Sequence, residues 1–417
     1  MGARPMACYD DGLTLPVREA ESMLTRLDVK NFRSIADCSV EFGPITVFFG
    51  PTSGGKSTLL YSLLVLRNFI VNPNQALDGL FNLGFQNFGG FEACVFNHVN
   101  SRAIGINAHF HNKTSYGVEL GKTSTRITQG SPFLHLETTV AVPYPANQPV
   151  AVNYAEEPLG EFTVNWNGFA STVSSISGEA VAQARAVAIA ETLNSTVEAL
   201  KRVDVCPHRR GFFKPSYSPT PLTPTPTSED EVATLIINDQ NAPPRISINT
   251  VVIFDRDFRV YTPPGTATTF LQTTEQKGAR VPGLLVNDGF GVNQVVYMLA
   301  KIHRPEADTI VIEEPEIHLH PTVIRNFARE LVTLARDEDK QLIFTTHSEQ
   351  FLLSLLACVK EGSLKADELR CYHVSREGKH TNFLHEPVSS NGQISGGLSS
   401  FMEAELQDIK SFLSVTQ

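Results

Sequence analysis

A glycine-rich segment, residues 50–58 (GPTSGGKST), carries the clearest chemical signal in the sequence. Glycine costs backbone entropy and proline removes a hydrogen-bond donor, so local stability does not explain this composition. The pattern Gly-x4-Gly-Lys-Ser instead predicts a loop whose bare amides surround a phosphate. We expect the Lys56 ammonium to contact the β- and γ-phosphates of a nucleotide and the Ser57 hydroxyl to ligate Mg²⁺.

The flanking residues support this interpretation. The apolar run 45–49 (ITVFF) predicts a strand before the loop, and residues 56–71 repeat apolar residues at helical spacing after it. An accidental glycine-rich turn would not require a strand and a helix in these places. The predicted nucleotide-binding residues are Gly50, Pro51, Thr52, Ser53, Gly54, Gly55, Lys56, Ser57 and Thr58.

Two adjacent carboxylates end a second apolar run, residues 309–314 (TIVIEE). Neighbouring acids at the end of a buried strand repel each other, and a divalent cation offsets that cost. We expect Glu313 to lie on the metal side and Glu314 to be the base for the attacking water. The alternative, a strand that ends in solvated acids, is disfavoured by the phosphate loop.

His347 follows a third apolar run, residues 341–346. From there its imidazole could hydrogen-bond to a γ-phosphate, and we assign it a catalytic role with Lys56 and Glu314. The alternative is a histidine that merely caps the end of a strand.

Composition limits the class of protein. The chain has 417 residues, of which 41% are hydrophobic, so it can bury a substantial core. The formal net charge of −10 does not indicate nucleic-acid binding, although a local basic groove is compatible with it. Six scattered cysteines without paired spacing predict thiols in a reducing compartment. We expect a cytoplasmic protein without a membrane partner, because no apolar run reaches spanning length and no signal peptide is evident.

The order of predicted elements indicates an α/β fold with a mixed or parallel sheet. Strands and helices alternate at both ends of the chain, whereas the middle reads as an antiparallel meander followed by a long helix. We therefore expect a flexible tail (1–22), an N-terminal lobe with the phosphate loop (23–97), a β-rich and helical insertion (98–280) with an exposed Pro/Thr loop (215–228), and a C-terminal part that ends in a hairpin (281–417).

Four segments together resemble the ABC-type ATPase heads of the RecF/SMC/OLD branch, including the AAA-family ATPases described as AbiEii-like. They are VKNFRSI (29–35), GFGVNQVVYMLA (289–300), VIEEPEIHLHP (311–321) and TTHS (345–348). The similarity spans most of residues 24–400. It implies a P-loop NTPase fold and an ATP-dependent homodimer that hydrolyses ATP with Mg²⁺.

The resemblance also implies residue roles at the dimer interface. Gly291, Asn293 and Gln294 stand where the branch carries its signature, which would face the nucleotide of the other subunit. Asn293 occupies a position where serine is usual. Residues 315–320 would contact their own copy across the dyad, although Glu316, His318 and His320 could alternatively be read as a metal cluster.

Two further interpretations depend on position or composition alone. Gln86, which follows the phosphate-loop helix, is a candidate for the glutamine that completes the Mg²⁺ shell, with a plain turn residue as the alternative. The cluster of Arg209, Arg210 and Lys214 beside aromatic residues could meet a phosphate backbone, but a solvated surface patch is favoured.

Two hypotheses for the biological role are compatible with these motifs. One hypothesis is the ATPase of a DNA-maintenance or phage-defence system, with its effector on another chain, because only a hairpin and a helix follow the histidine motif. The other is an ATP-gated scaffold that binds a protein partner and turns over slowly. A transporter subunit is disfavoured because the LSGGQ signature is absent.

Overall fold

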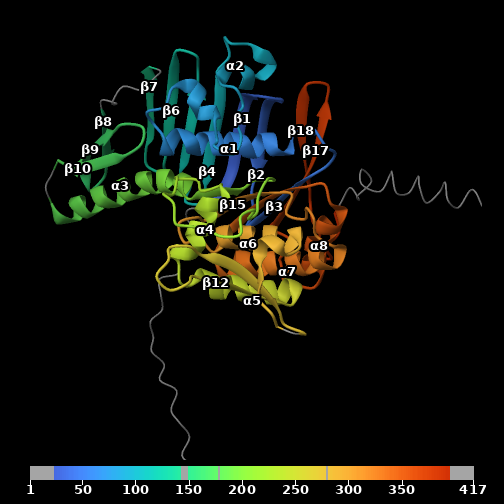
Figure 1. Cartoon of the computed structure of the whole chain (residues 1–417). Coiled ribbons are helices and arrows are strands. Elements are labelled where there is room, and N and C mark those ends of the chain that lie inside the picture. Colours follow the sequence, from blue (N-terminus) through green and yellow to red (C-terminus); the bar gives the residue numbers. More distant parts are fainter. Residues whose placement is uncertain (1–22, 142–148, 177–178, 279, 395–417) are drawn as a thin grey trace, which may run out of the picture.

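The computed structural model describes residues 23–141, 149–176, 179–278 and 280–394; the tail expected at 1–22 lies outside these residues. The described strands form two six-stranded and two three-stranded sheets. Figure 1 shows how the helices and strands are arranged in space.

The core sheet has the order β11-β15-β16-β3-β17-β18. Its strands are β3 (Ile45–Phe49), β11 (Val203–Cys206), β15 (Thr309–Glu313), β16 (Gln341–Thr346), β17 (Leu369–Glu377) and β18 (His380–Glu386). All neighbouring pairs are parallel except the β17–β18 hairpin, as the sequence predicted. Glu313 pairs with Thr345, and Thr346 pairs with Phe49, so the carboxyl ends of β15, β16 and β3 meet at one edge.

The second six-stranded sheet is antiparallel, with the order β2-β1-β4-β5-β6-β7. It comprises β1 (Leu24–Phe32), β2 (Ile35–Glu41), β4 (Ile104–Phe110), β5 (Ser115–Leu120), β6 (Ser124–Gly130) and β7 (His135–Ala141). β4 pairs directly with β1, so the domain boundary expected after residue 97 falls within one sheet. Alternation predicted the strands but not their partners, because the period of two is the same for any antiparallel neighbour.

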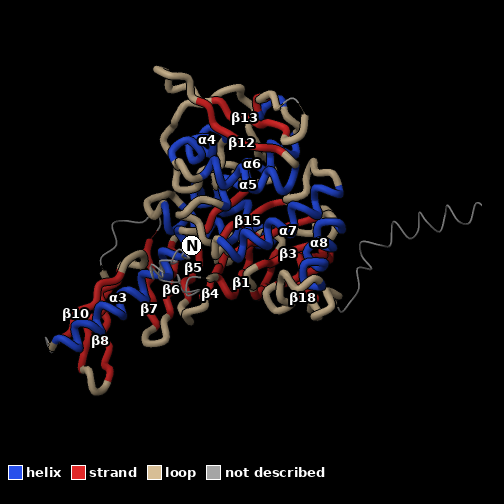
Figure 2. The backbone as a smooth tube through the Cα atoms, turned by 90° about the horizontal axis from the view of Figure 1, so that it is seen from below, coloured by secondary structure: helices blue, strands red, loops and turns tan. Residues whose placement is uncertain are grey.

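A smaller unit extends from this sheet. It consists of β8 (Val150–Glu156), β9 (Gly160–Trp166), β10 (Ser171–Ser175) and α3 (Ala180–Lys201), which packs on β10 and β9. Figure 2 shows α3 and β8–β10 together at one side of the chain. The long helix expected after the meander is therefore confirmed as α3.

Helices cover the two faces of the core sheet. One hydrophobic core surrounds α1 (Lys56–Val71) and includes strands of the antiparallel sheet; the other includes residues of α4 (Glu229–Asn238), α5 (Ala242–Phe254), α6 (Phe290–Ile302), α7 (Pro321–Asp337) and α8 (Glu349–Lys360). Val311 of β15 faces the first core, and Ile310 and Ile312 face the second. A strand buried on both faces explains the continuous apolar run.

Other short elements complete the described chain. They are α2 (Phe91–Cys94), three short 3₁₀ helices (Leu77–Phe81, Phe96–His98 and Leu285–Asn287), and a three-stranded sheet of β12 (Arg256–Tyr261), β13 (Phe270–Glu275) and β14 (Gly283–Leu284). In the described part of the chain, no helix is both long enough and apolar enough to cross a membrane.

The Pro/Thr loop is only partly exposed, unlike the loop expected from its composition. Arg67 of α1 donates to the Pro224 carbonyl (2.6 Å) and to the Thr225 hydroxyl. Tyr297 of α6 donates to the Thr227 carbonyl (2.7 Å). The end of the loop therefore bridges the helix that follows the phosphate loop and the helix of the signature segment.

Candidate active site

The phosphate loop has the predicted strand–loop–helix context. β3 ends at Phe49 and α1 begins at Lys56, with Gly55 as the helix N-cap in a left-handed conformation. Gly50 has φ 137°, and a Cβ there would lie 2.3 Å from the carbonyl oxygen of Val374 on β17. Glycine is therefore required at residue 50, because the loop passes directly over a neighbouring strand.

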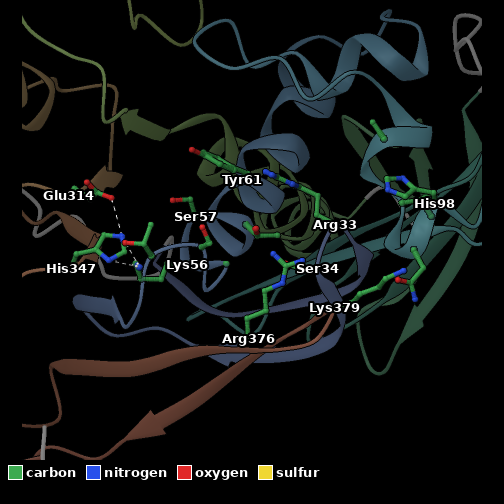
Figure 3. Close-up of a pocket in the computed structure, with 17 residues that line it drawn as sticks. Arg33, Ser34, Lys56, Ser57, Tyr61, His98, Glu314, His347, Arg376 and Lys379 are labelled. Carbon is green, nitrogen blue, oxygen red and sulfur yellow. Dashed lines mark hydrogen bonds and ion pairs between the residues drawn. The ribbon is translucent and has the colours of Figure 1, made fainter. Parts of the chain in front are cut away.

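Lys56 is directed into the loop that precedes it. Its Nζ donates to the carbonyls of Gly50 and Pro51 (both 3.0 Å) and lies 2.9 Å from Nε2 of His347. Burial lowers the pKa of Lys56 to about 8, against the opposing effect of two nearby glutamate charges. Figure 3 shows Lys56 and His347 side by side, with Glu314 above them.

Glu313 is buried at the end of β15 beside the start of α1. Its Oε2 accepts hydrogen bonds from the Ser57 hydroxyl (2.9 Å) and the Tyr61 phenol (2.8 Å). Its Oε1 is buried and has no hydrogen-bond partner among the described residues. Burial also raises the pKa of this carboxyl group. A free buried oxygen next to a serine hydroxyl fits a hard cation such as Mg²⁺, which prefers oxygen ligands.

Glu314 follows in a strained backbone conformation, with φ 45°. Its amide donates to the Thr345 carbonyl (2.9 Å), and its Oε1 lies 3.3 Å from Nε2 of His347. The hydrogen bond with His347 is the largest cause that lowers the pKa of Glu314. Its side chain is one-third exposed (32%), so a charged carboxylate faces the cavity.

One cavity of about 610 Å³ lies beside these groups. Lys56, Ser57, Glu314 and His347 line one end, and Figure 3 shows a group of basic side chains at the other end. That group consists of Arg33 after β1, His98 after α2, and Arg376 and Lys379 at the β17–β18 turn. No pattern in the sequence indicated a role for this group or for Tyr61, although Arg33 lies within the VKNFRSI motif.

The residues considered as a metal cluster have separate roles in this structure. Glu316 Oε1 accepts from the Thr346 hydroxyl (2.6 Å) and from two backbone amides after β16. His320 caps α7, and His318 packs against Phe290 with ring centroids 5.2 Å apart. No group of three potential metal-binding side chains occurs in the described residues. The geometry does not support the metal-cluster alternative.

The signature residues lie at the start of α6. Gly291 approaches the 318–319 backbone so closely that a Cβ would lie 2.9 Å from the His318 carbonyl oxygen. Asn293 and Gln294 are buried, at 4% and 3% exposure. Asn293 Oδ1 accepts from the Phe212 amide and its Nδ2 donates to the Phe212 carbonyl. In this chain the Asn293 side chain therefore points inward, which differs from the outward orientation expected for a contact with another subunit.

Gln86 lies outside the cavity lining. Its side chain is exposed, and its Nε2 donates to the neighbouring Asn87 carbonyl (3.3 Å). The structure does not bring Gln86 together with Ser57 and Glu313.

Parts of this chain are similar to known protein families and to a known protein. Residues 236–352 match a family model described as an AAA ATPase domain, and residues 26–67 match one described as an AAA domain. The chain is 25% identical over 344 residues to an OLD nuclease from Thermus scotoductus, covering 79% of this chain and 60% of the relative. The chain thus spans less than two-thirds of that relative's length.

Solved structures with detectable likeness include SMC heads. One is the SMC head domain from Thermotoga maritima, with 10% identity, TM-score 0.41, and coverage of 88% of this chain and 99% of that one. Another is an Smc head bound to the C-winged helix domain of ScpA, with 10% identity, TM-score 0.46, and coverage of 87% and 97%.

The family models and the phosphate loop between β3 and α1 define this protein as a P-loop ATPase. Within that class, the motifs and the OLD nuclease relative make it similar to the ABC-type ATPases of the RecF/SMC/OLD branch. The resemblance stated from the sequence is confirmed.

Proposed function

We propose that this chain is an ATP-driven switch that binds MgATP, forms a homodimer around it, and hydrolyses it. The observation that carries this proposal is the meeting of three groups at one cavity: the phosphate loop with Lys56, the Ser57–Glu313 pair, and the Glu314–His347 pair. Three parallel strands place them there, because their carboxyl ends share one edge of the core sheet.

Each side chain has a defined task in this proposal. The loop amides and Lys56 hold the phosphates, and His347 lies within reach of the same region. Ser57 and Glu313 would hold Mg²⁺, which neutralises charge on the phosphates when bound. Glu314 accepts a proton from water as that water attacks the γ-phosphorus, and the bond to the β–γ bridging oxygen breaks to give ADP and phosphate.

Exposed aromatic residues support dimerisation at the signature segment. Phe290 at the start of α6 is 52% exposed, and Phe213 is 55% exposed. Their ring centroids lie 5.8 Å apart, and Phe290 also contacts His318. Adjacent exposed aromatics are typical of surfaces that meet a partner.

We place the switch in DNA maintenance or phage defence, with an effector on another chain. The support is the similarity to an OLD nuclease over 79% of this chain. Stimulation of turnover by DNA would support this role. A tight protein partner without any response to DNA would favour the ATP-gated scaffold instead.

Sedimentation of the Glu314→Gln variant tests the dimer. This variant should bind MgATP without hydrolysing it, so we expect its mass to double when MgATP is added. Lys56→Ala is the control, because it should not bind ATP and should keep the same mass under both conditions. An unchanged mass for Glu314→Gln at saturating MgATP would contradict the proposed dimer.

A further inference from the structure

Residues 207–214 connect the two catalytic carboxylates to α6. This segment follows β11 at the edge of the core sheet, and its basic residues read from the sequence as a solvated patch. That interpretation is wrong for Arg210, which is 3% exposed. A buried guanidinium is costly unless its donors are satisfied, so its partners indicate its role.

Arg210 holds the end of β15 through main-chain carbonyls. Its Nη1 donates to the carbonyls of Pro207 (3.0 Å) and Glu313, and its Nη2 donates to the Glu314 carbonyl (2.7 Å). One planar guanidinium thus holds the main chain of both Glu313 and Glu314. Arg210 touches neither of their side-chain oxygens in these hydrogen bonds, so the Glu314 carboxylate can still face the cavity.

The same segment is attached to α6 two residues later. Asn293 Oδ1 accepts from the Phe212 amide (2.7 Å), and Asn293 Nδ2 donates to the Phe212 carbonyl (2.8 Å). Gly211 between them has φ 129°, and a Cβ there would lie 2.8 Å from Asn293 Oδ1. The phenyl ring of Phe212 is buried against Tyr297 of α6, with centroids 5.9 Å apart. The segment therefore has little freedom to move independently of α6.

We propose that Arg210 is a positioning residue for Glu313 and Glu314, and that Asn293 and Phe212 make their geometry depend on the position of α6. The φ of 45° at Glu314 is costly for a residue with a Cβ, and such a conformation persists only where its surroundings impose it. The guanidinium supplies that constraint, since its fixed fork contacts both carbonyls at once. A lysine ammonium is a single point charge and cannot reproduce that arrangement.

This inference rests on the proposed function, because it concerns the carboxylates to which that function assigns hydrolysis. It adds a way in which a contact on α6 would change the positions of these carboxylates. Movement of the α6 N-terminus would be transmitted through Phe212 and Arg210 to the backbone of Glu314.

The test compares Arg210→Lys with Arg67→Lys. Arg67 is a matched control: it is also buried (4% exposed) and also donates to main-chain carbonyls, those of Lys201 and Pro224. It lies 11 residues after Lys56 on α1, roughly 16 Å away along the helix axis. Both variants should lose thermal stability, whereas only one should affect the carboxylates.

We expect Arg210→Lys to lower kcat by about 30- to 100-fold while the ATP dissociation constant changes by less than about threefold. Arg67→Lys should retain kcat within about twofold. If Arg210 only stabilised the fold, both variants would contain less active protein. The active protein that remained would have a normal kcat and a normal ATP dissociation constant. Equal kcat values for the two variants, corrected for the folded fraction, would overturn the proposal.

Hydrogen exchange gives a readout that does not depend on turnover. In Arg210→Lys, the amides of 311–320 should exchange faster than in wild type, and in Arg67→Lys they should not. Absence of ATP hydrolysis by the wild-type protein would overturn the proposed function. Unchanged exchange at 311–320 in Arg210→Lys would overturn the role of Arg210, whatever the turnover of the wild-type protein. If Arg210→Lys did not fold, Gly211→Ala would take its place, with the same expected and contradicting results.

Discussion

The Nε2 atom of His347 lies 2.9 Å from the Lys56 ammonium and 3.3 Å from Oε1 of Glu314. One imidazole thus stands between the phosphate-binding cation and the proposed base. β16 places it there, because His347 follows the last residue of that strand. Because His347 contacts both groups, replacing it tests whether ATP binding or turnover depends on it more strongly.

Replacement of His347 by alanine should lower kcat by about 100-fold, because Glu314 loses the group that orients its carboxylate. ATP affinity should fall much less, since the loop amides and Lys56 remain. Steady-state phosphate release and calorimetric binding measure the two effects. The control is His111→Ala, an exposed histidine outside the cavity; equal loss of binding and turnover in His347→Ala would argue against the assigned role.

ATP affinity should decrease as the pH rises above about 8. The cationic form of Lys56 binds phosphate, and burial lowers its pKa to about 8 in this structure. Below that pH the ammonium is already charged, so binding is insensitive to this group. Above it, binding must take up a proton, and the affinity should fall by up to tenfold per pH unit.

Calorimetry in buffers of different ionisation enthalpy would measure this linkage directly. Proton uptake should be near zero at about pH 7 and should approach one proton per ATP above about pH 9. A dissociation constant that is unchanged over this interval, with no proton uptake, would show that Lys56 does not titrate on binding.

Gly50→Ala should reduce the free energy of unfolding by about 3 kcal/mol, because a strained φ is combined with a clash against the Val374 carbonyl. Gly84→Ala is the matched control. Gly84 also has positive φ (83°), but a Cβ there meets nothing within 4 Å, so the cost should be about 1 kcal/mol. Urea denaturation of both variants measures the difference; equal losses would show that the close approach of β17 is unimportant.

The predictable parts of this molecule are those set by local pattern. The phosphate loop and the carboxylates of 313–314 follow from spacing and from the rule that parallel strands end at one edge. Arg210 and Tyr61 were missed as contacts of Glu313 because each lies far away in sequence. Their role depends on which elements become neighbours, and hydrophobic periodicity does not specify that.

Asn293 shows that a side-chain orientation expected from the sequence can also differ in the structure. The resemblance to the RecF/SMC/OLD branch implied that Asn293 would face the nucleotide of another subunit. The structure instead orients it inward with Val292, Val295 and Val296, because Phe212 supplies both hydrogen-bond partners. A polar residue among apolar ones at this spacing is compatible with burial whenever a backbone segment can pair with it.

Phosphate release by wild-type protein and by Glu314→Gln, with ATP binding measured in parallel, tests the central claim most directly. Glu191→Gln, an exposed change on α3, is the control. We predict Mg²⁺-dependent turnover in wild type and in the control, and at least a 100-fold lower rate in Glu314→Gln with ATP affinity retained. Undiminished turnover in purified Glu314→Gln protein would contradict the account.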